Sequence, residues 1–289
     1  MVAPAYMPKE KGFPPTLVDQ ALDDALASSA AVPVLALSGL QGSGKSTLAR
    51  QMVQRARMRG LHAATLSIDD VYLPRVHRQR LARTVHPLLV TRGPPGTHDL
   101  PLAHEVFDAV QSRRPIALPR FDKLADERLP TTQWPRVQRP LDLLVFEGWF
   151  LGTPAEHDEA ALQEPLNALE READADGVWR RWCNARLAGD YPALWQRCDR
   201  LWFLQPPGFA VVPRWRWQQE QALQAAQPGR SGMTRPQLER FVQYYERVSR
   251  LALRSLPLLA DRVVPLDGER RVADGRAAEV NPPGTSPAD

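Results

Sequence analysis

Residues 39–47 read GLQGSGKST and follow directly on the apolar run VPVLALS of residues 32–38. Gly39, Gly44, Lys45 and Ser46 satisfy the pattern G-x-x-x-x-G-K-[ST] of a phosphate-binding P-loop. Glycines permit the tight turn in which several backbone N–H groups converge on phosphate oxygens, and the following helix adds its positive end. A glycine-rich turn that binds nothing is the alternative. The position between a predicted strand and a predicted helix favours the phosphate cradle.

The lysine of this loop stands out in an arginine-rich chain. Only four lysines occur, at positions 9, 11, 45 and 123. A slim ammonium fits between phosphates where a planar guanidinium is too wide. In P-loop enzymes the lysine contacts the β- and γ-phosphates, and the next hydroxyl ligates Mg²⁺. We therefore predict that ATP and Mg²⁺ bind here, with ATP contacted by Gly39, Leu40, Gln41, Gly42, Ser43, Gly44, Lys45, Ser46 and Thr47.

Acidic residues follow two further predicted strands. Glu147 closes the apolar run at 141–146, and Asp69 and Asp70 close the run at 61–68. Open α/β sheets bind their ligands at the carboxyl ends of the strands. We therefore predict that Glu147 joins Ser46 in holding Mg²⁺, and that one aspartate takes the proton of an acceptor hydroxyl. An exposed strand-end glutamate, and an aspartate pair that polarises water, ligates Mg²⁺ or caps a turn, are the alternatives.

The composition of the chain excludes several classes of protein. The chain has 289 residues, 43% of them hydrophobic, and a net charge of +4. No run approaches 18 apolar residues and no apolar leader begins the chain, so neither a membrane partner nor secretion is expected. Cys183 and Cys198 form no metal-binding or disulfide pattern. Arginines are interleaved with acids, so no nucleic-acid partner is expected either. A cytoplasmic protein is the resulting prediction.

The hydrophobic pattern predicts the fold class. Apolar runs typical of buried strands occur at 32–38, 61–68, 141–146, 201–204 and 262–266, and helical patterns at 17–27, 46–59, 102–113 and 237–256. Strands alternating with helices predict an α/β protein with a three-layer, doubly wound, mainly parallel sheet that carries the P-loop, with inserted segments between the strands. We expect a flexible segment at 1–16, one domain at 17–268 and a disordered tail at 269–289.

Several segments together resemble the P-loop D-glycerate 3-kinases and their bacterial relatives. They are LSIDDVYLP (66–74), TRGPPGTHDL (91–100), LPRFDK (118–123), VFEGWFLG (145–152), EPLNALE (164–170), RWRWQQE (214–220) and MTRPQLERFVQYYERV (233–248). The resemblance covers roughly residues 33–267 and implies a P-loop kinase fold with inserted helical and lid segments. The layout is more distantly similar to uridine kinase, pantothenate kinase and phosphoribulokinase, which implies that Asp69 is the base. Val71, where an aromatic residue is common, and LADER at 124–128 depart from the pattern.

The resemblance implies that D-glycerate is the acceptor and that 3-phosphoglycerate is the product. A small anion needs a cation for its carboxylate and a few placed polar groups for its hydroxyls. Charged residues of three family-like segments, together with Arg128 just after the third, are candidates, although each could instead pair within its own loop. The candidates are Asp70, Arg92, His98, Asp99, Arg120, Asp122, Lys123 and Arg128.

The segment RWRWQQE lies where kinases of this group carry lid arginines. Arg214 and Arg216 could close over the triphosphate and stabilise charge on the moving phosphoryl group. The alternative is an amphipathic helix with Trp215 packed inward and both arginines in solvent. Other functions also remain open: a kinase of a nucleoside, pantothenate-like compound or other hydroxy acid, a nucleotide-switched ATPase without an acceptor, or a nucleic-acid-dependent ATPase.

Overall fold

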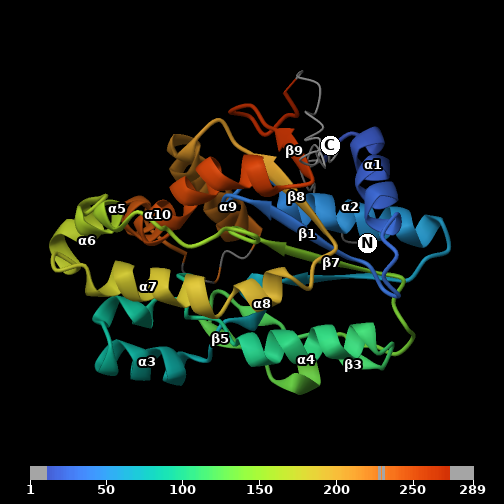
Figure 1. Cartoon of the computed structure of the whole chain (residues 1–289), viewed down its shortest axis with the longest axis horizontal. Helices are drawn as coiled ribbons and strands as arrows, with labels where there is room; N and C mark the ends of the chain where they lie inside the picture. Colours follow the sequence, from blue (N-terminus) through green and yellow to red (C-terminus); the bar gives the residue numbers. More distant parts are fainter. Residues whose placement is uncertain (1–11, 227–228, 230–231, 274–289) are drawn as a thin grey trace, which may run out of the picture.

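Five parallel strands form the central sheet of the computed structural model, which describes residues 12–226, 229 and 232–273 (Figure 1). Their order across the sheet is β2-β7-β1-β8-β9. The strands are β1 (Val34–Gly39), β2 (Ala63–Ser67), β7 (Leu143–Gly148), β8 (Arg200–Gln205) and β9 (Arg262–Pro265). All five predicted strands are present, and the predicted doubly wound α/β fold is confirmed.

Successive side chains of each strand point to opposite faces of the sheet, and helices cover both faces. On β1, Leu35 and Leu37 pack with the helices α1 (Pro15–Leu26) and α2 (Lys45–Met58). Val34 and Ala36 point to the opposite face, in a cluster with α4 (Leu100–Gln111), α7 (Val178–Gly189) and α8 (Pro192–Trp195). Figure 1 shows these two helical layers on either side of the strands. A sheet covered on both faces explains why the strands read as continuous apolar runs.

The strand order places the P-loop at a switch point of the sheet. β1 pairs with β7 on one side and with β8 on the other, and the helix that follows β1 covers one face of the sheet, whereas the helices that follow β7 cover the other. Ser38 lies opposite Gly148, and Ser67 lies opposite Glu147. The residues that end β1, β2 and β7 therefore meet at one edge, where ligands of such sheets bind.

Inserted segments surround that edge. Between β2 and β7 lie the 3₁₀ turns η1 (Ile68–Val71), η2 (Pro87–Val90) and η3 (Thr131–Gln133), the helices α3 (Arg75–Thr84) and α4, and two small antiparallel pairs, β3 (Ile116–Ala117) with β6 (Arg136–Val137) and β4 (Phe121–Asp122) with β5 (Glu127–Arg128). Between β7 and β8 lie α5 (Glu159–Gln163), α6 (Ala168–Ala173), α7 and α8. After β8 come η4 (Phe209–Val211), α9 (Val212–Ala226) and α10 (Arg235–Leu259).

Helix α3 was not predicted, because its segment shows no clear apolar stripe. The only buried side chain on this helix is the fully enclosed Arg78. Its guanidinium donates hydrogen bonds to the carbonyl oxygens of Leu73, Val90 and Asp126. A buried cation with several carbonyl acceptors thus anchors α3 where apolar periodicity gives no signal.

The two ends of the described chain lie against the P-loop. Phe13 is buried, and its backbone N–H and C=O pair with the Gln51 side chain of α2. Near the other end, Arg270 donates from Nε to the carbonyl oxygen of Gly42, at 2.6 Å. Residues 1–11 and 274–289, which carry most of the predicted flexible segment and tail, lie outside the described residues. The division of the chain at 16 and 269 stays a prediction.

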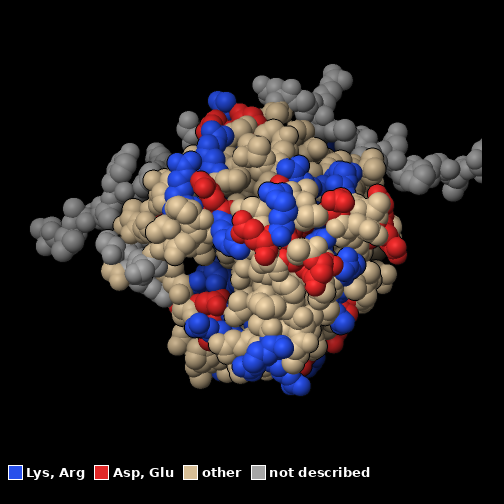
Figure 2. Space-filling view, turned by 90° about the vertical axis from the view of Figure 1, so that its left-hand side faces the viewer, with Lys and Arg blue, Asp and Glu red and all other residues tan. Residues whose placement is uncertain are grey.

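Charged side chains are mixed on the face that carries α5 and α6. Figure 2, which views that side of Figure 1, shows basic and acidic residues interspersed. Ion pairs join them, such as Arg240 with Glu172 and Arg254 with Glu156. The positive charge of this face is therefore locally balanced. In the described part of the chain, no helix has the length and apolar character needed to cross a bilayer.

Candidate active site

The P-loop connects β1 to α2 and encloses a buried lysine. Gly44 caps α2 with φ at 94°, a left-handed conformation that glycine adopts readily. Lys45 is 8% exposed, and its Nζ donates to the carbonyl oxygen of Leu40 at 3.0 Å. Burial lowers the pKa of Lys45, although the carboxylates of Glu147 and Asp69 oppose that shift. The ammonium is thus held inside the loop, where poor solvation strengthens its attraction to phosphate.

Glycine at position 42 is required by the close approach of α9. Its φ is 83°, and a Cβ added there would lie 2.6 Å from Cβ of Trp215. Any side chain would therefore push the loop away from α9. The glycine content of this loop serves contact with a neighbouring helix as well as the tight turn.

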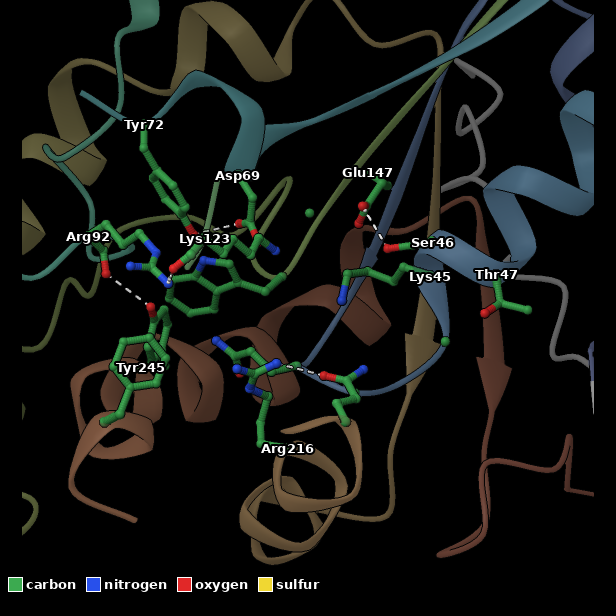
Figure 3. Close-up of a pocket in the computed structure, with 17 residues that line it drawn as sticks. Lys45, Ser46, Thr47, Asp69, Tyr72, Arg92, Lys123, Glu147, Arg216 and Tyr245 are labelled. Atoms are coloured by element: carbon green, nitrogen blue, oxygen red, sulfur yellow. Dashed lines mark hydrogen bonds and ion pairs between the residues drawn. The ribbon is translucent and has the colours of Figure 1, made fainter. Parts of the chain in front are cut away.

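A hydroxyl and a carboxylate meet beside the P-loop. Ser46 begins α2 with Lys45 and donates from Oγ to Oε1 of Glu147 at 2.8 Å (Figure 3). Glu147 lies near the end of β7 and is largely buried. No group of three or more His, Cys, Asp or Glu residues in the described part of the chain could hold a metal. Two hard oxygen donors fit Mg²⁺, which keeps waters and takes phosphate oxygens for the rest of its shell.

Asp69 has both carboxylate oxygens engaged. The Tyr72 hydroxyl donates to Oδ1 at 2.6 Å, and Lys123 donates from Nζ to Oδ2 at 2.5 Å. Burial raises the pKa of Asp69, but the Lys123 charge and the hydrogen bonds from Lys123 and Tyr72 outweigh it, so the pKa lies well below its usual range. In this state Asp69 is ionised and weakly basic.

Asp70 faces a different environment. Its Oδ2 accepts hydrogen bonds from the backbone N–H of Ser67 and from Arg120, at 3.2 and 3.1 Å. Burial raises the pKa of Asp70 to about 6, against the opposing charge of Arg120. Asp70 closes the capping box of η1 with Ser67 and, like Arg120, is not among the residues that line the cavity at the P-loop. The structure therefore does not bring Asp70 and Arg120 to the pocket, although both were predicted to contact substrate.

One cavity of about 150 Å³ joins the P-loop to Asp69. In Figure 3, Lys45, Ser46 and Glu147 lie on one side, and Asp69, Tyr72, Arg92, Lys123 and Tyr245 on the other. The loops after β1, β2 and β7, the β4–β5 hairpin, α9 and α10 all contribute. The lining residues are Gln41, Gly42, Gly44, Lys45, Ser46, Thr47, Asp69, Tyr72, Arg92, Lys123, Glu147, Gly148, Trp149, Arg216, Gln219, Phe241 and Tyr245.

Arg92 is fixed by contacts on both sides. Its guanidinium pairs with Asp126 and donates to the carbonyl oxygen of Lys123. Its own carbonyl oxygen accepts from the Tyr245 hydroxyl at 2.9 Å. The next residue, Gly93, has φ at 112°, and a Cβ there would lie 2.3 Å from that hydroxyl. The glycine thus allows α10 to hold the Arg92 loop against the cavity.

Other predicted substrate residues build the walls behind the cavity. Asp99 caps α4 through the backbone N–H of Leu102 and pairs with Arg128 at 2.8 Å. Asp122 accepts from two backbone N–H groups of the β4–β5 turn. His98 is buried, with Nδ1 2.7 Å from the Tyr191 hydroxyl. The structure therefore brings only Arg92 and Lys123, of the predicted acceptor residues, to the cavity together with Asp69.

The two predicted lid arginines lie in different surroundings. Arg216 reaches the cavity from α9, where it donates to Gln219 at 2.7 Å. Arg214 instead pairs with Glu269, away from the cavity lining. Trp215 between them is fully buried and donates to the carbonyl oxygen of Gly268. Both interpretations of this segment thus apply in part, because α9 packs through its tryptophan and presents one arginine.

Four aromatic residues of the cavity were missed by sequence reasoning. Tyr72, Trp149, Phe241 and Tyr245 line it, and the indole N–H of Trp149 has no hydrogen-bond partner among the described residues. Tyr72 could have been found, because it follows Asp69 by three residues and so lies one 3₁₀ turn away. The α10 residues gave no signal beyond helical periodicity.

The fold and cavity define a P-loop phosphotransferase, with a phosphate cradle and the charged side chains of Asp69, Arg92 and Lys123 in one pocket. No family model matches the sequence. An uncharacterized kinase of Schizosaccharomyces pombe is 31% identical over 228 residues, 73% of this chain and 78% of that protein. The chloroplastic D-glycerate 3-kinase of Arabidopsis thaliana is also 31% identical over 73% of this chain, which spans 46% of that protein.

A solved structure extends this similarity to the fold. The D-glycerate 3-kinase from Cryptococcus neoformans var. grubii superposes with a TM-score of 0.73 and 25% identity, covering 91% of this chain and 97% of that one. The chain belongs to the family of P-loop kinases that includes the D-glycerate 3-kinases.

The buried His98 predicts a pH dependence of stability. Burial lowers the pKa of His98 to about 3, against the opposing charge of Asp69. The unfolded state therefore binds a proton between about pH 6.5 and 3 that the native state does not, so stability falls as the pH falls through this window. His98→Gln removes this dependence, which is worth at most about 1.4 kcal/mol per pH unit.

Urea unfolding of wild type and His98→Gln at pH 7.5 and pH 4.5 measures the effect. We expect the variant to lose about 2.5–3 kcal/mol less unfolding free energy than wild type on acidification. His77→Gln, at an exposed histidine of α3, is the control. Parallel losses in wild type and His98→Gln would contradict a neutral buried imidazole.

Proposed function

We propose that this protein transfers the γ-phosphate of ATP to D-glycerate and forms 3-phosphoglycerate. The observation that carries the proposal is the single cavity in which the P-loop faces Asp69, Arg92 and Lys123. The D-glycerate 3-kinases of plant and fungal origin in the same family support the choice of acceptor. The proposed catalytic domain is residues 17–268, to which Phe13 and Arg270 on either side add the wall of a groove beside the P-loop. The proposed compartment is the cytoplasm.

ATP fits across the P-loop with its terminal phosphates in the cavity at Asp69 and its nucleoside in a separate groove. The triphosphate would lie on the loop N–H groups with its terminal phosphates at Lys45, beside the Asp69 cavity. A groove of about 900 Å³ continues from Gly42, Gly44 and Thr47 toward Phe13 and Arg270, large enough for a nucleoside. Ser46 and Glu147 would hold Mg²⁺, which when bound offsets the negative charge of the phosphate oxygens.

The acceptor side has the charges that a small hydroxy acid requires. The Lys123 side chain is 54% exposed, so its ammonium can exchange Asp69 for another carboxylate at little cost in solvation. Arg92 presents a second cation, positioned by Asp126. A carboxylate of the acceptor bound at Lys123 would loosen the ion pair that keeps Asp69 weakly basic. Substrate binding thus raises the basicity of Asp69 where the acceptor hydroxyl must lose its proton.

Phosphoryl transfer then follows from this placement. The acceptor oxygen forms a bond to the γ-phosphorus as its proton passes to Asp69, and the bond from that phosphorus to the bridging oxygen breaks to release ADP. Lys45 and Arg216 stabilise the charge that spreads over the phosphoryl oxygens. The ring of Trp149 adds an apolar wall beside the acceptor.

An acceptor panel tests this proposal directly. ADP release is measured with D-glycerate, L-glycerate, glycerol, uridine and pantothenate, and phosphorus NMR identifies the phosphorylated oxygen. We expect turnover with D-glycerate and a 3-phosphate product. Preference for uridine or pantothenate would identify a kinase of another acceptor. ATP hydrolysis that ignores every compound of the panel would favour a nucleotide-switched ATPase.

The two neighbouring aspartates should differ sharply in activity. Asp69→Asn keeps the shape of the side chain and removes its basicity, so kcat should fall by about 10²–10⁴-fold while the KM for ATP changes little. Asp70→Asn is the matched control, because Asp70 pairs with Arg120 outside the cavity. Steady-state kinetics across a Mg²⁺ titration measure both variants. The assignment is falsified if Asp69→Asn keeps most of its turnover while Asp70→Asn loses it.

Substitutions of the cationic side chains in the two loops should also differ in their effect on acceptor binding. Arg92→Gln and Lys123→Met each remove a charge that faces the acceptor, whereas Arg120→Gln removes one that pairs with Asp70. Loss of a charge-assisted contact costs about 1.5–3 kcal/mol, so we expect the KM for D-glycerate to rise about ten- to hundredfold in the first two variants. The KM for ATP should stay near wild type. Equal changes in both KM values would indicate a structural role instead.

A further inference from the structure

Residues 267–271 form a tight turn beside the P-loop and α9. The backbone N–H of Asp267 donates to the carbonyl oxygen of Arg271 at 2.8 Å. The carboxylate Oδ1 of Asp267 accepts from the backbone N–H groups of Glu269 and Arg271, at 2.8 and 2.9 Å. The turn is thus held by its own hydrogen bonds, and the side chain of Arg270 makes its contacts outside the turn.

The backbone of Arg270 adopts a conformation that arginine does not favour. Its φ is 64°, in the left-handed region where a Cβ crowds the following carbonyl and where glycine or asparagine fits better. Among the non-glycine residues that the structure describes, only Arg113, Asp126 and Arg270 have a positive φ. An arginine held in this conformation indicates that its side chain has a function that an ordinary turn residue would not supply.

The guanidinium of Arg270 joins the P-loop to α9. Its Nε donates to the carbonyl oxygen of Gly42 at 2.6 Å, and its Nη2 donates to Oε1 of Gln218 at 2.7 Å. The guanidinium also lies over the ring of Trp215, 5.1 Å from the ring centroid. A planar guanidinium can contact two acceptors and an aromatic face at the same time. One side chain thus fixes the separation between the P-loop backbone and the helix.

The residues of α9 that contact Arg270 alternate with residues that line the active-site cavity. Trp215 and Gln218 contact Arg270. The residue after each of them, Arg216 and Gln219, lines the cavity. Residues three apart share one face of a helix, so these two pairs lie on adjacent faces of the same helical turn. Arg216 donates to Gln219 at 2.7 Å and points from α9 into the cavity (Figure 3).

Further contacts hold this part of α9 against the turn and the P-loop. Trp215 is fully buried, and its indole N–H donates to the carbonyl oxygen of Gly268 at 2.9 Å. Arg214 forms an ion pair with Glu269 at 2.8 Å. On the P-loop side, Gly42 leaves no room for a Cβ beside Trp215. A shift of α9 relative to the P-loop therefore requires that several of these contacts break together.

We propose that Arg270 is a positioning residue for phosphoryl transfer, which acts through α9 to hold Arg216 at the γ-phosphate of ATP. The inference rests on the role proposed above for Arg216 in stabilising the phosphoryl oxygens. A cation stabilises the transition state most when it is already in place, because no reorganisation is then needed during the reaction. Without the guanidinium of Arg270, α9 loses its link to the Gly42 carbonyl, and Arg216 loses its fixed position relative to Lys45.

Isothermal titration calorimetry in the presence of Mg²⁺ tests this role without an acceptor. The probes are ADP and the non-hydrolysable ATP analogue AMP-PNP, which carries the terminal phosphate that ADP lacks. Arg270→Asn removes the guanidinium and keeps a residue that tolerates the left-handed backbone. We expect this variant to weaken AMP-PNP binding about tenfold more than ADP binding. Equal weakening of both nucleotides, or no weakening of either, would overturn the inference.

A second variant removes a contact of Arg270 without changing the turn. Gln218→Leu keeps the size of an exposed side chain of α9 and removes the acceptor of the 2.7 Å hydrogen bond. It should weaken AMP-PNP binding relative to ADP binding by about two- to fivefold. Arg235→Gln is the matched control, because it removes an exposed arginine that pairs with Glu239 on α10, away from the active-site lining. A change of the same size in this control would overturn the inference.

A double-mutant cycle shows whether Arg270 acts through Arg216. Arg216→Gln alone should weaken AMP-PNP binding relative to ADP binding about tenfold. In the Arg270→Asn background the same substitution should add less than about twofold, because residues that act through one contact are not additive. Fully additive effects would overturn the inference. An unchanged ratio in Arg216→Gln would contradict the role of Arg216 and overturn the inference with it.

Steady-state kinetics with D-glycerate extend the test to turnover. Arg270→Asn should lower kcat about tenfold and leave the KM for D-glycerate near wild type, since Arg270 lies on the nucleotide side. A raised KM for D-glycerate with kcat unchanged would overturn the inference. Absence of wild-type turnover with D-glycerate would contradict the choice of acceptor, and the two nucleotide affinities would still decide the role of Arg270.

Discussion

The parallel pairing of β1 with both β7 and β8 is the constraint on which the site depends. Because the helix after β1 covers one face of the sheet and the helices after β7 cover the other, the carboxyl ends of these two neighbouring strands open at a switch point of the sheet. The register then brings Ser67 opposite Glu147 and Ser38 opposite Gly148, so the segments after three strands meet. A shift of one residue would turn these polar ends away from each other and the apolar side chains out of the core. Packing of the core and assembly of the site are thus one requirement.

Sequence analysis predicted those parts of the site that short sequence motifs and strand ends identify. The P-loop, Glu147 after an apolar run, and Asp69 after another could all be placed at the sheet edge from strand periodicity. Sequence could not separate Asp69 from Asp70, because the difference comes from the 3₁₀ turn η1. In that turn Asp70 closes a capping box with Ser67, while Asp69 meets Tyr72 and Lys123. Neighbours in sequence thus acquire opposite shifts of pKa.

Sequence reasoning also overcounted the acceptor residues. In sequence, an arginine or aspartate that contacts a ligand cannot be told from one that forms an ion pair within the protein. Asp99 caps α4, and Arg120 pairs with Asp70. Such roles depend on which loops pack together, and that information is tertiary. The same limit applies to Phe241 and Tyr245, which line the cavity. They lie on a long helix that is distant in sequence from the P-loop, so the sequence does not show that they contribute to the site. Helical periodicity marks a buried face without saying what that face meets.

The contact between Arg270 and the carbonyl oxygen of Gly42 joins residues 228 positions apart. Beyond the P-loop itself, the groove proposed for the nucleoside draws on Phe13 from the start of the described chain and on Arg270 and Val272 from its end. During synthesis the P-loop emerges early, but these last residues leave the ribosome only after β8, α10 and β9. Contacts of such long sequence separation form late in folding, because the intervening loop entropy must be overcome first. The nucleotide groove is therefore complete only when residues from both ends of the described chain have met, and ATP stabilises that state over any intermediate in which they have not.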